Sequence, residues 1–311
     1  MNIMNQTATR ADRFRGCLVG LATGDAVGTT LEFRNRGHFK PIDDMVGGGP
    51  FSLKPGQWTD DTSMALCLAA SLVEKQGMDL ADQLTKYNRW YHDGYMSSNG
   101  SCFDIGMQTR RSLGRFATAG EVYDVGSGSM SEGNGSLMRL APVPMFYSRN
   151  KSKAIEMAAE SSRTTHGAKN CLDCCSVFAE ILVKALEGAP KEEILKPLSD
   201  IPADYSDEVK LIMQMKFLKF SERRIRGSGH VIRCLEAALW CFHHTDNFRD
   251  AILKAANLGE DADTTAAVCG QIAGAFYGET GIPASWLEKL AFRPMIEELA
   301  DKIGDVSDAA T

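Results

Sequence analysis

Apolar residues recur along this chain with the spacing of helices that pack against a core. Between residues 64 and 73, two apolar rows run side by side at a spacing of four: Met64, Leu68 and Leu72, with Ala65, Ala69 and Val73. Paired rows of this kind form the wide apolar face of a helix. The stretches 177–186, 231–242 and 264–277 predict three more buried helices. Because no segment shows convincing strand alternation, we predict an all-α fold.

The chain is expected to form one domain. Its two glycine-rich breaks, at residues 47–50 and 126–135, are too short to link domains, and we find no internal repeat. We predict a flexible N-terminal tail over residues 1–11, a compact multi-helix domain over 12–303 and a C-terminal tail over 304–311. Ala266, Gly270 and Gly274 share one stripe of the last predicted helix, which allows a second helix to approach closely.

Composition and charge argue against several classes of protein. The 311 residues are 44% apolar and 24% charged, which is typical of a globular chain that buries a core without disulfides. A formal net charge of −6 argues against general nucleic-acid binding. No apolar stretch approaches the length of a membrane span, and residues 1–20 lack the apolar block of a signal peptide. We predict a cytoplasmic monomer without a nucleic-acid or membrane partner.

Two local features have ordinary explanations. Nine cysteines, an odd number, fit reduced thiols in that compartment. Cys171, Cys174 and Cys175 offer only three thiols within an apolar helical pattern, which favours core packing over a zinc site. A basic run is better explained as a solvated helix face than as a contact for an acidic partner; it comprises Lys216, Lys219, Arg223, Arg224 and Arg226.

Two acidic clusters stand directly before two of the predicted helices: Thr59-Asp60-Asp61-Thr62 and Asp261-Ala262-Asp263-Thr264. Either cluster alone is explained by helix capping, because Asp and Thr cap N-termini and suit the helix dipole. Together they hold more carboxylates than two caps need, and converging aspartates would repel one another unless cations neutralised them. Oxygen ligands without imidazole or thiolate favour Mg²⁺ or Mn²⁺. An EF-hand fits poorly, because the second cluster lacks the loop glycine and the closing glutamate.

Four further segments hold candidate site residues. The small residues of 24–28 let the backbone pass close to a neighbour, and Glu32 follows, a residue usually explained by a surface salt bridge. Asp104 lies among apolar residues, so it either caps a helix or sits in a low-dielectric pocket suited to acid–base chemistry. Residues 126–136 form either a flexible surface loop or an anion nest for a diphosphate. His166, taken alone, is more often structural than catalytic.

In order along the chain, these segments resemble the ADP-ribosylglycohydrolase family, which includes the dinitrogenase-reductase-activating glycohydrolases of bacteria. The resemblance extends from about Arg13 to about Trp286. Its motifs are Gly24-Asp25-Ala26-x-Gly28 with Glu32-Phe33, Trp58-Thr59-Asp60-Asp61-Thr62, Phe103-Asp104-Ile105-Gly106, Gly133-Asn134-Gly135-Ser136-Leu137-Met138-Arg139, Thr165-His166-Gly167, Leu235-Glu236-Ala237-Ala238-Leu239-Trp240 and Asn257-Leu258-Gly259-Glu260-Asp261-Ala262-Asp263-Thr264-Thr265. Each motif alone is modest support, whereas the ordered set is highly specific.

The resemblance implies an all-α fold around a dinuclear Mg²⁺ or Mn²⁺ centre. By position, the residues that resemble metal ligands are Thr59, Asp60, Asp61, Asp261, Asp263 and Thr264. Glu32 and Asp104 resemble the acidic residues that family members place beside the centre and the scissile bond. The residues that resemble parts of an ADP-ribose pocket are Gly126, Ser127, Gly128, Ser129, Gly133, Asn134, Gly135, Ser136, His166 and His230. Two positions depart from the family: Glu260, where many members have Gly or Asp, and His230, where many have a stacking Tyr.

The resemblance also implies a reaction, the hydrolytic removal of ADP-ribose from a modified protein side chain. Two ions would hold the hydroxyls of the distal ribose, while Glu32 or Asp104 protonates the leaving group or activates water. ADP-ribosyl-arginine is the first expected substrate, and serine adducts or free ADP-ribose derivatives are alternatives. The role would be endogenous regulation or immunity to an ADP-ribosylating toxin, with a cognate transferase as a further partner. Two rival interpretations are a catalytically silent ADP-ribose- or transferase-binding protein and a metal-dependent nucleotide phosphohydrolase.

Overall fold

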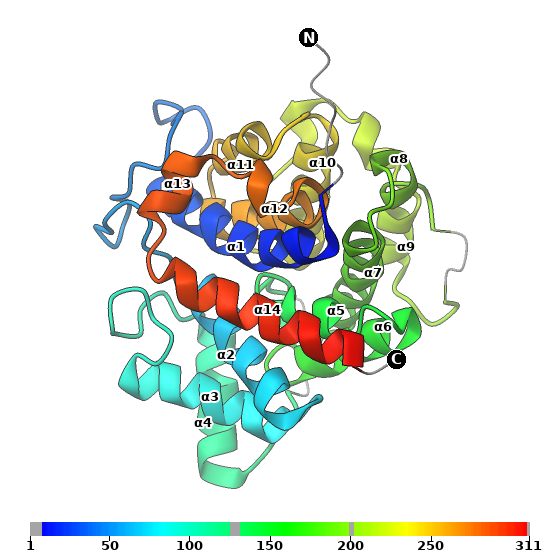
Figure 1. The fold of residues 1–311 in the computed structure, drawn as a ribbon. Coiled ribbons are helices and arrows are strands. Elements are labelled where there is room, and N and C mark those ends of the chain that lie inside the picture. Colours follow the sequence, from blue (N-terminus) through cyan, green and yellow to red (C-terminus); the bar gives the residue numbers. More distant parts are fainter. Residues whose placement is uncertain (1–7, 125–130, 199–201, 310–311) are drawn as a thin grey trace.

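Helices make up the regular structure of this chain, which is described here from a computed structural model (Figure 1). The structure describes residues 8–124, 131–198 and 202–309. Within these ranges the only β-type pairings are two isolated bridges, Gly48–Leu53 and Gly133–His230, so the all-α prediction is confirmed. The α-helices are α1 (Arg10–Gly28), α2 (Asp60–Lys75), α3 (Leu80–Asp93), α4 (Met107–Ala119), α5 (Pro142–Phe146), α6 (Lys151–Arg163), α7 (Lys169–Leu186), α8 (Lys191–Ile194), α9 (Asp207–Met213), α10 (Val231–His243), α11 (Phe248–Ala256), α12 (Ala262–Tyr277), α13 (Ala284–Lys289) and α14 (Arg293–Ala309). Short 3₁₀ turns lie at Thr29–Leu31, Lys216–Lys219, Glu222–Arg224 and Glu279–Gly281.

Local sequence signals explain where many of these helices begin and end. The four predicted helices lie within α2, α7, α10 and α12. Asp79 caps the start of α3 by accepting a hydrogen bond from the amide of Asp82 at 2.9 Å, and Gly94 ends that helix in the left-handed conformation. None of the described helices is both long and apolar enough to cross a membrane. At the ends of the chain, α1 already begins at Arg10 and α14 continues to Ala309, beyond the start expected for the C-terminal tail.

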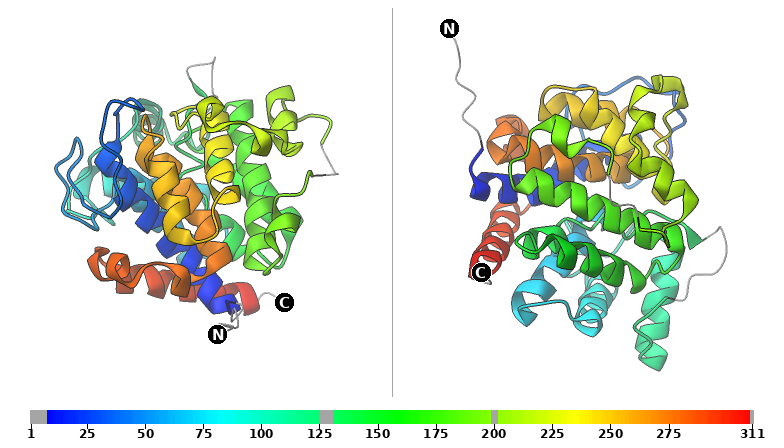
Figure 2. Two further views of the ribbon diagram at one scale, coloured as in Figure 1. Left: turned by 90° about the horizontal axis from the view of Figure 1, so that it is seen from above. Right: turned by 90° about the vertical axis from the view of Figure 1, so that its right-hand side faces the viewer.

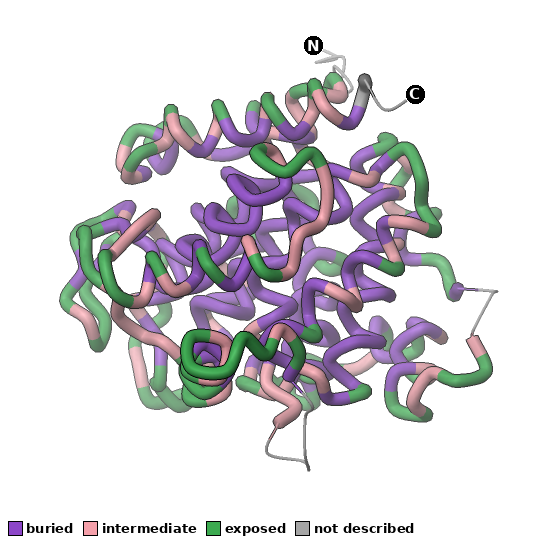
Figure 3. The backbone as a smooth tube through the Cα atoms, turned by 90° about the horizontal axis from the view of Figure 1, so that it is seen from below, coloured by how far each residue is buried: buried purple, intermediate pink, exposed green. Residues whose placement is uncertain are grey.

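The core is built around an antiparallel pair of helices, α1 and α12. Figures 1 and 2 show these two helices side by side, with α10 and α11 on one flank and α14 crossing toward α2. The backbone tube in Figure 3 is buried over most of this centre and exposed mainly at the outer turns. Periodicity did not reveal α1, because every residue from Gly16 to Gly28 is buried and no single face is apolar.

Small residues let the backbones of α1 and α12 come into contact. Opposite the predicted stripe on α12, α1 presents glycines at every fourth position from Gly16 to Gly28. A Cβ added at Gly274 would lie 1.8 Å from the carbonyl oxygen of Gly16, and one at Gly24 would lie 2.1 Å from that of Ala266. The predicted close approach of a second helix to this stripe is therefore confirmed. It also brings the C-terminal end of α1 against the N-terminal end of α12, where an acidic cluster begins.

We expect Gly274→Ala to lower the free energy of unfolding by about 3 kcal/mol, because the added methyl group can fit only if two helix backbones separate. Gly114 is the matched control, since it lies in α4 and a Cβ there meets no atom within 4 Å. Gly114→Ala should raise stability by about 0.5–1 kcal/mol through helix propensity. Urea unfolding followed by circular dichroism measures both. Equal effects of the two substitutions would contradict the packing argument.

Candidate active site

The start of α2 is capped by a residue of another helix, Asp25 of α1. Its buried carboxylate accepts hydrogen bonds from the amides of Thr59 and Thr62, at 2.9 and 3.0 Å, and from their hydroxyls, at 3.0 and 2.6 Å. Burial raises the pKa of Asp25 to about 6, although these hydrogen bonds oppose the shift. Thr59 itself makes no side-chain cap bond. Capping therefore does not explain Asp60 and Asp61, and sequence reasoning had assigned Asp25 no role.

The structure brings the two acidic clusters together. The Thr264 hydroxyl at the start of α12 lies 3.4 Å from Oδ2 of Asp61 in α2, a contact between residues 203 positions apart. Carboxylate oxygens of Glu32, Asp261 and Asp263 lie within 4.8 Å of one another. The convergence expected from the sequence is therefore present in the structure, and Glu32 joins it from the segment that follows α1.

Crowding of these carboxylates makes their ionisation costly in the absence of a cation. Burial and then neighbouring carboxylates hold the pKa values of Asp60 and Asp61 well above their usual range, and raise those of Asp104 and Asp263 to about 8. Oδ1 of Asp61 and Oε2 of Glu32 are buried and have no hydrogen-bond partner. Oxygen donors that are close, buried and partly unsatisfied fit a hard divalent cation, whose charge would favour their ionised forms.

The segment that presents Glu32 is tied to the turn that presents Asp261. The amide of Phe33 donates to the carbonyl of Glu260 at 2.7 Å, and the amide of Glu260 donates to the carbonyl of Arg34 at 2.7 Å. Three non-glycine residues around the site adopt the left-handed region, with φ of 59°, 61° and 61°: Phe33, Asp104 and Glu260. Each such residue costs about 1–3 kcal/mol, and such residues cluster at functional sites.

A cavity of about 1050 Å³ lies over the acidic cluster. The predicted site residues that line it are Glu32, Asp60, Asp104, Gly133, Asn134, Gly135, His166, Asp261, Asp263 and Thr264. Three others stand behind the lining: Thr59 and Asp61 within the acidic cluster, and Ser136, whose hydroxyl accepts a hydrogen bond from that of Ser162 at 2.8 Å. The predicted loop residues Gly126, Ser127, Gly128 and Ser129 lie outside the described residues.

His230 is not part of this lining, in contrast to the expected stacking role. Its Nδ1 accepts a hydrogen bond from the amide of Ile232 at 3.3 Å, so the ring caps α10. Its Nε2 lies 3.0 Å from a carboxylate oxygen of Glu132. The neighbouring Gly229 lines the cavity instead.

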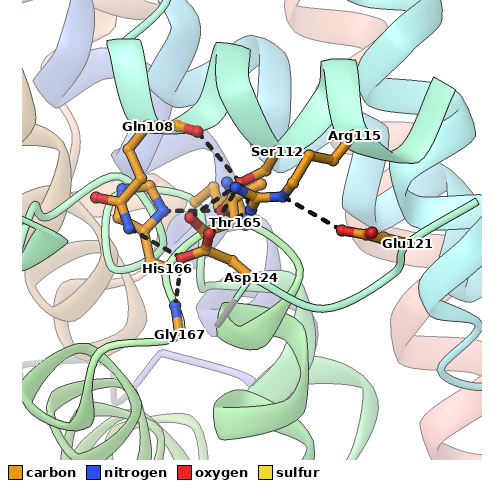
Figure 4. A network of polar contacts seen from close by, with 9 residues as sticks. Gln108, Ser112, Arg115, Glu121, Asp124, Thr165, His166 and Gly167 are labelled. Atoms are coloured by element: carbon orange, nitrogen blue, oxygen red, sulfur yellow. Dashed lines mark hydrogen bonds and ion pairs between the residues drawn. The ribbon is translucent and has the colours of Figure 1, made fainter. Parts of the chain in front are cut away.

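Asp124 is a residue of the cavity wall that sequence reasoning missed. It accepts hydrogen bonds from the amide of Gly167 at 3.1 Å and from Gln108 at 3.2 Å, and it forms an ion pair with Arg115 (Figure 4). Burial opposes its ionisation, but these hydrogen bonds outweigh burial and hold its pKa below the usual range. Asp124 thereby joins α4 to the segment that carries His166. No sequence pattern marked it, because its partners come from separate elements.

Asn134 connects the glycine loop to the acidic cluster. Its side-chain Nδ2 donates to Oδ2 of Asp261 at 2.9 Å, and its amide donates to the carbonyl of Gly229 at 3.0 Å. These two hydrogen bonds hold the loop against the start of α12. This contact places backbone of residues 133–135 beside the carboxylates, so one ligand can touch both.

Comparisons with known proteins agree with one another. A sequence model of the family described as ADP-ribosylglycohydrolase matches residues 6–310. Proteins named ADP-ribosylarginine hydrolase Tri1 from Pseudomonas putida and Serratia proteamaculans are 45% and 43% identical, each over 94% of this chain and over 78% and 79% of their own length. The ADP-ribosyl dinitrogen reductase glycohydrolase of Rhodospirillum rubrum is 30% identical over 90% of both chains. A solved structure described as an ADP-ribosylglycohydrolase-related protein complex aligns with a TM-score of 0.84 and 41% identity, over 96% of this chain and 99% of that one.

Proposed function

This chain belongs to the ADP-ribosylglycohydrolase family, and from that premise we propose that it hydrolyses the bond between ADP-ribose and an arginine side chain of a modified protein. The observation that carries this proposal is the cavity of about 1050 Å³, whose lining combines carboxylates with the backbone of Gly133–Gly135 and with His166. Its volume suits a nucleotide-sized ligand. The names of the Pseudomonas and Serratia relatives support arginine as the linkage.

We further propose that the acidic cluster holds two divalent ions, Mg²⁺ or Mn²⁺. The proposed ligands are Thr59, Asp60, Asp61, Asp261, Asp263 and Thr264. The unpartnered buried oxygens of Asp61 and Glu32 support this assignment, because a buried carboxylate oxygen without a partner is costly unless a cation neutralises it. When bound, such ions would supply positive charge that orients hydroxyl groups and water at the site.

The protein's own groups would then bind the substrate and move the proton. Water forms the new bond to the anomeric carbon as the carbon–nitrogen bond breaks, and a proton reaches the leaving guanidine nitrogen. Glu32 and Asp104 are the two lining carboxylates proposed for this proton transfer. The backbone of Gly133–Gly135 and the ring of His166 would bind the diphosphate. The products are free ADP-ribose and unmodified arginine.

The proposal is tested by incubating the purified protein with an arginine-ADP-ribosylated protein, in Mg²⁺ or Mn²⁺ and in chelator, and following the products by mass spectrometry. We expect metal-dependent release of intact ADP-ribose together with restored arginine. Release of AMP or phosphate would identify a nucleotide phosphohydrolase instead. Retention of bound ADP-ribose without turnover, on arginine and serine adducts alike, would identify a catalytically silent binder.

We propose a cytoplasmic site of action, either in reversing an endogenous modification or in protecting against an ADP-ribosylating toxin. A cognate transferase would be the partner in the second case. Challenge of cells with such a transferase, in the presence of the wild type or of an Asp60→Ala variant, separates the two ways of protecting. Protection by the variant would show physical blocking, and protection by the wild type alone would show enzymatic reversal.

A further inference from the structure

A buried cation lies directly behind the glycine loop of the cavity. The side chain of Arg139 is fully buried, and its guanidinium donates to the carbonyl of Gly135 at 3.2 Å and to the hydroxyls of Thr164 and Thr165 at 3.3 and 2.7 Å. Its Cζ lies 4.7 Å from the ring centre of Tyr87. Within the described ranges all of its acceptors are neutral, and its Nε has no partner. Burial of a guanidinium without a carboxylate is costly, so the arrangement calls for an explanation.

Thr165 connects this cation to His166. The Thr165 hydroxyl oxygen accepts the hydrogen bond from Arg139 and lies 2.8 Å from Nδ1 of His166. Guanidinium groups only donate, whereas a hydroxyl has a single proton to give. If Nδ1 carried a proton, the Thr165 hydroxyl would accept hydrogen bonds from both Arg139 and Nδ1. The hydroxyl's own proton would then have no acceptor among the contacts of this buried residue. The hydroxyl therefore donates to Nδ1, and the ring proton resides on Nε2.

The ring of His166 is neutral, and His166 lines the cavity. Burial first, and the charge of Arg139 second, lower the pKa of His166 to about 3. A Cβ added at Gly135 would lie only 2.9 Å from Nε2, and one at Gly133 would lie 3.4 Å from it, so the ring edge packs on the glycine loop. In the part of the chain that the structure describes, Nε2 has no protein acceptor, whereas Nδ1 is engaged by Thr165. The N–H of Nε2 is available to a ligand.

The backbone around His166 is also held in place. The amide of His166 donates to the carbonyl of Ser162 at 2.7 Å, and the amide of Gly167 donates to Asp124 at 3.1 Å. Figure 4 shows Thr165, His166 and Gly167 gathered beside Asp124 and α4. With the backbone anchored on both sides, the hydrogen bond to Nδ1 determines which ring nitrogen carries the proton.

We propose that Arg139 and Thr165 are positioning residues that hold neutral His166 as its Nε2–H tautomer, so that the cavity presents a fixed N–H donor to an anionic oxygen of its ligand. The chemistry of that ligand, the diphosphate of ADP-ribose, rests on the proposed function, whereas the tautomer does not. Arg139 acts through Thr165 and touches no ligand. A hydroxyl that accepts from a cation is also a stronger donor, which strengthens its bond to Nδ1.

The tautomer is tested by two-bond ¹H–¹⁵N correlation on the ligand-free full chain with labelled histidine. The His166 signals are assigned by their loss in His166→Gln. We expect a protonated Nε2 and an unprotonated Nδ1 in the wild type. Thr165→Val removes the hydroxyl and should give a mixture of tautomers, as should Arg139→Met, whereas Thr165→Ser should restore the wild-type pattern. Thr164→Val is the matched control, because Thr164 bonds to Arg139 but not to the ring.

The consequence for ligand binding is measured with ADP-ribose by calorimetry and with the modified protein by kinetics. Thr165→Val should weaken binding and raise KM by about tenfold, with kcat nearly unchanged and Thr165→Ser restoring both. The proposal would be overturned if His166 of the wild type were protonated on Nδ1, were charged, or were a mixture of the two tautomers. This outcome is decisive even if no variant folds. An unchanged ring in Thr165→Val would overturn it as well. If ADP-ribose neither binds nor is released while the Nε2–H pattern holds, the proposed function fails and the positioning role stands.

Discussion

Replacement of Asp60 or Asp263 by Ala is expected to abolish divalent-ion binding and turnover while the helical circular dichroism stays that of the wild type. Both carboxylates line the cavity, and each lies at the start of a helix whose apolar positions remain unchanged. Loss of a positioned charge at a reacting centre costs on the order of 10²–10³-fold in kcat, and loss of the ions themselves would cost more. Calorimetric titration with Mn²⁺ and the ADP-ribose release assay measure the two effects.

Asp204→Ala is the control, because the Asp204 side chain is 82% exposed and lies away from the cavity.

Thermal stability in chelator is a second measurement, in which a substitution at Asp263 is expected to increase stability although it abolishes activity. Burial and Asp25 raise the folded-state pKa of Asp263 to about 8, so the folded metal-free protein keeps a proton that the unfolded chain releases, and its stability falls as the pH rises from about 4 to 8. Asp263→Asn should therefore raise Tm in chelator at pH 7 and remove the gain in Tm that Mn²⁺ gives the wild type. Full activity of either alanine variant in chelated buffer would refute the ion-binding proposal.

Glu32→Gln is expected to lower kcat by about 10²–10⁴-fold, the range for loss of a positioned acid or base. Glu32 is buried, one of its oxygens has no partner, and its carboxylate forms a group with those of Asp261 and Asp263 within 4.8 Å of one another. Asp104→Asn should have the smaller effect, because Asp104 is only partly buried and does not belong to that close group. Single-turnover rates at saturating substrate measure both variants.

Mn²⁺ affinity separates the possible origins of these losses. We expect Asp104→Asn to bind Mn²⁺ within a few-fold of the wild type, unlike the variants at Asp60 and Asp263. Glu32→Gln should lie between these limits, because the Glu32 carboxylate adjoins those of Asp261 and Asp263. A larger loss of kcat in Asp104→Asn than in Glu32→Gln would exchange the roles of the two carboxylates. If neither substitution lowered kcat by tenfold, proton transfer by these side chains would be excluded, and the ion site alone would have to account for the rate.

Site residues were predictable from the sequence where their chemistry and the local structure coincide. Asp60 and Asp261 stand at helix starts, and a surplus of carboxylates there is visible in the sequence without any fold. Residues that act through distant partners escaped notice. Asp25 holds Thr62, 37 positions away, and Asp124 holds Gly167, 43 positions away. The resemblance predicts a ligand-binding role for His230, and in the structure its ring caps α10.

The sequence by itself determined the helices α2, α7, α10 and α12, the all-α class and the acidic helix starts, because a period of 3.6 and helix-start chemistry are local properties. Only the tertiary structure decided that α1 is buried on all sides, that its glycines meet those of α12, and that the acidic clusters converge. The proton position on His166 likewise follows from three side chains that packing brings together. Such contacts depend on how helices cross in space, and the spacing of residues along one chain does not specify a crossing.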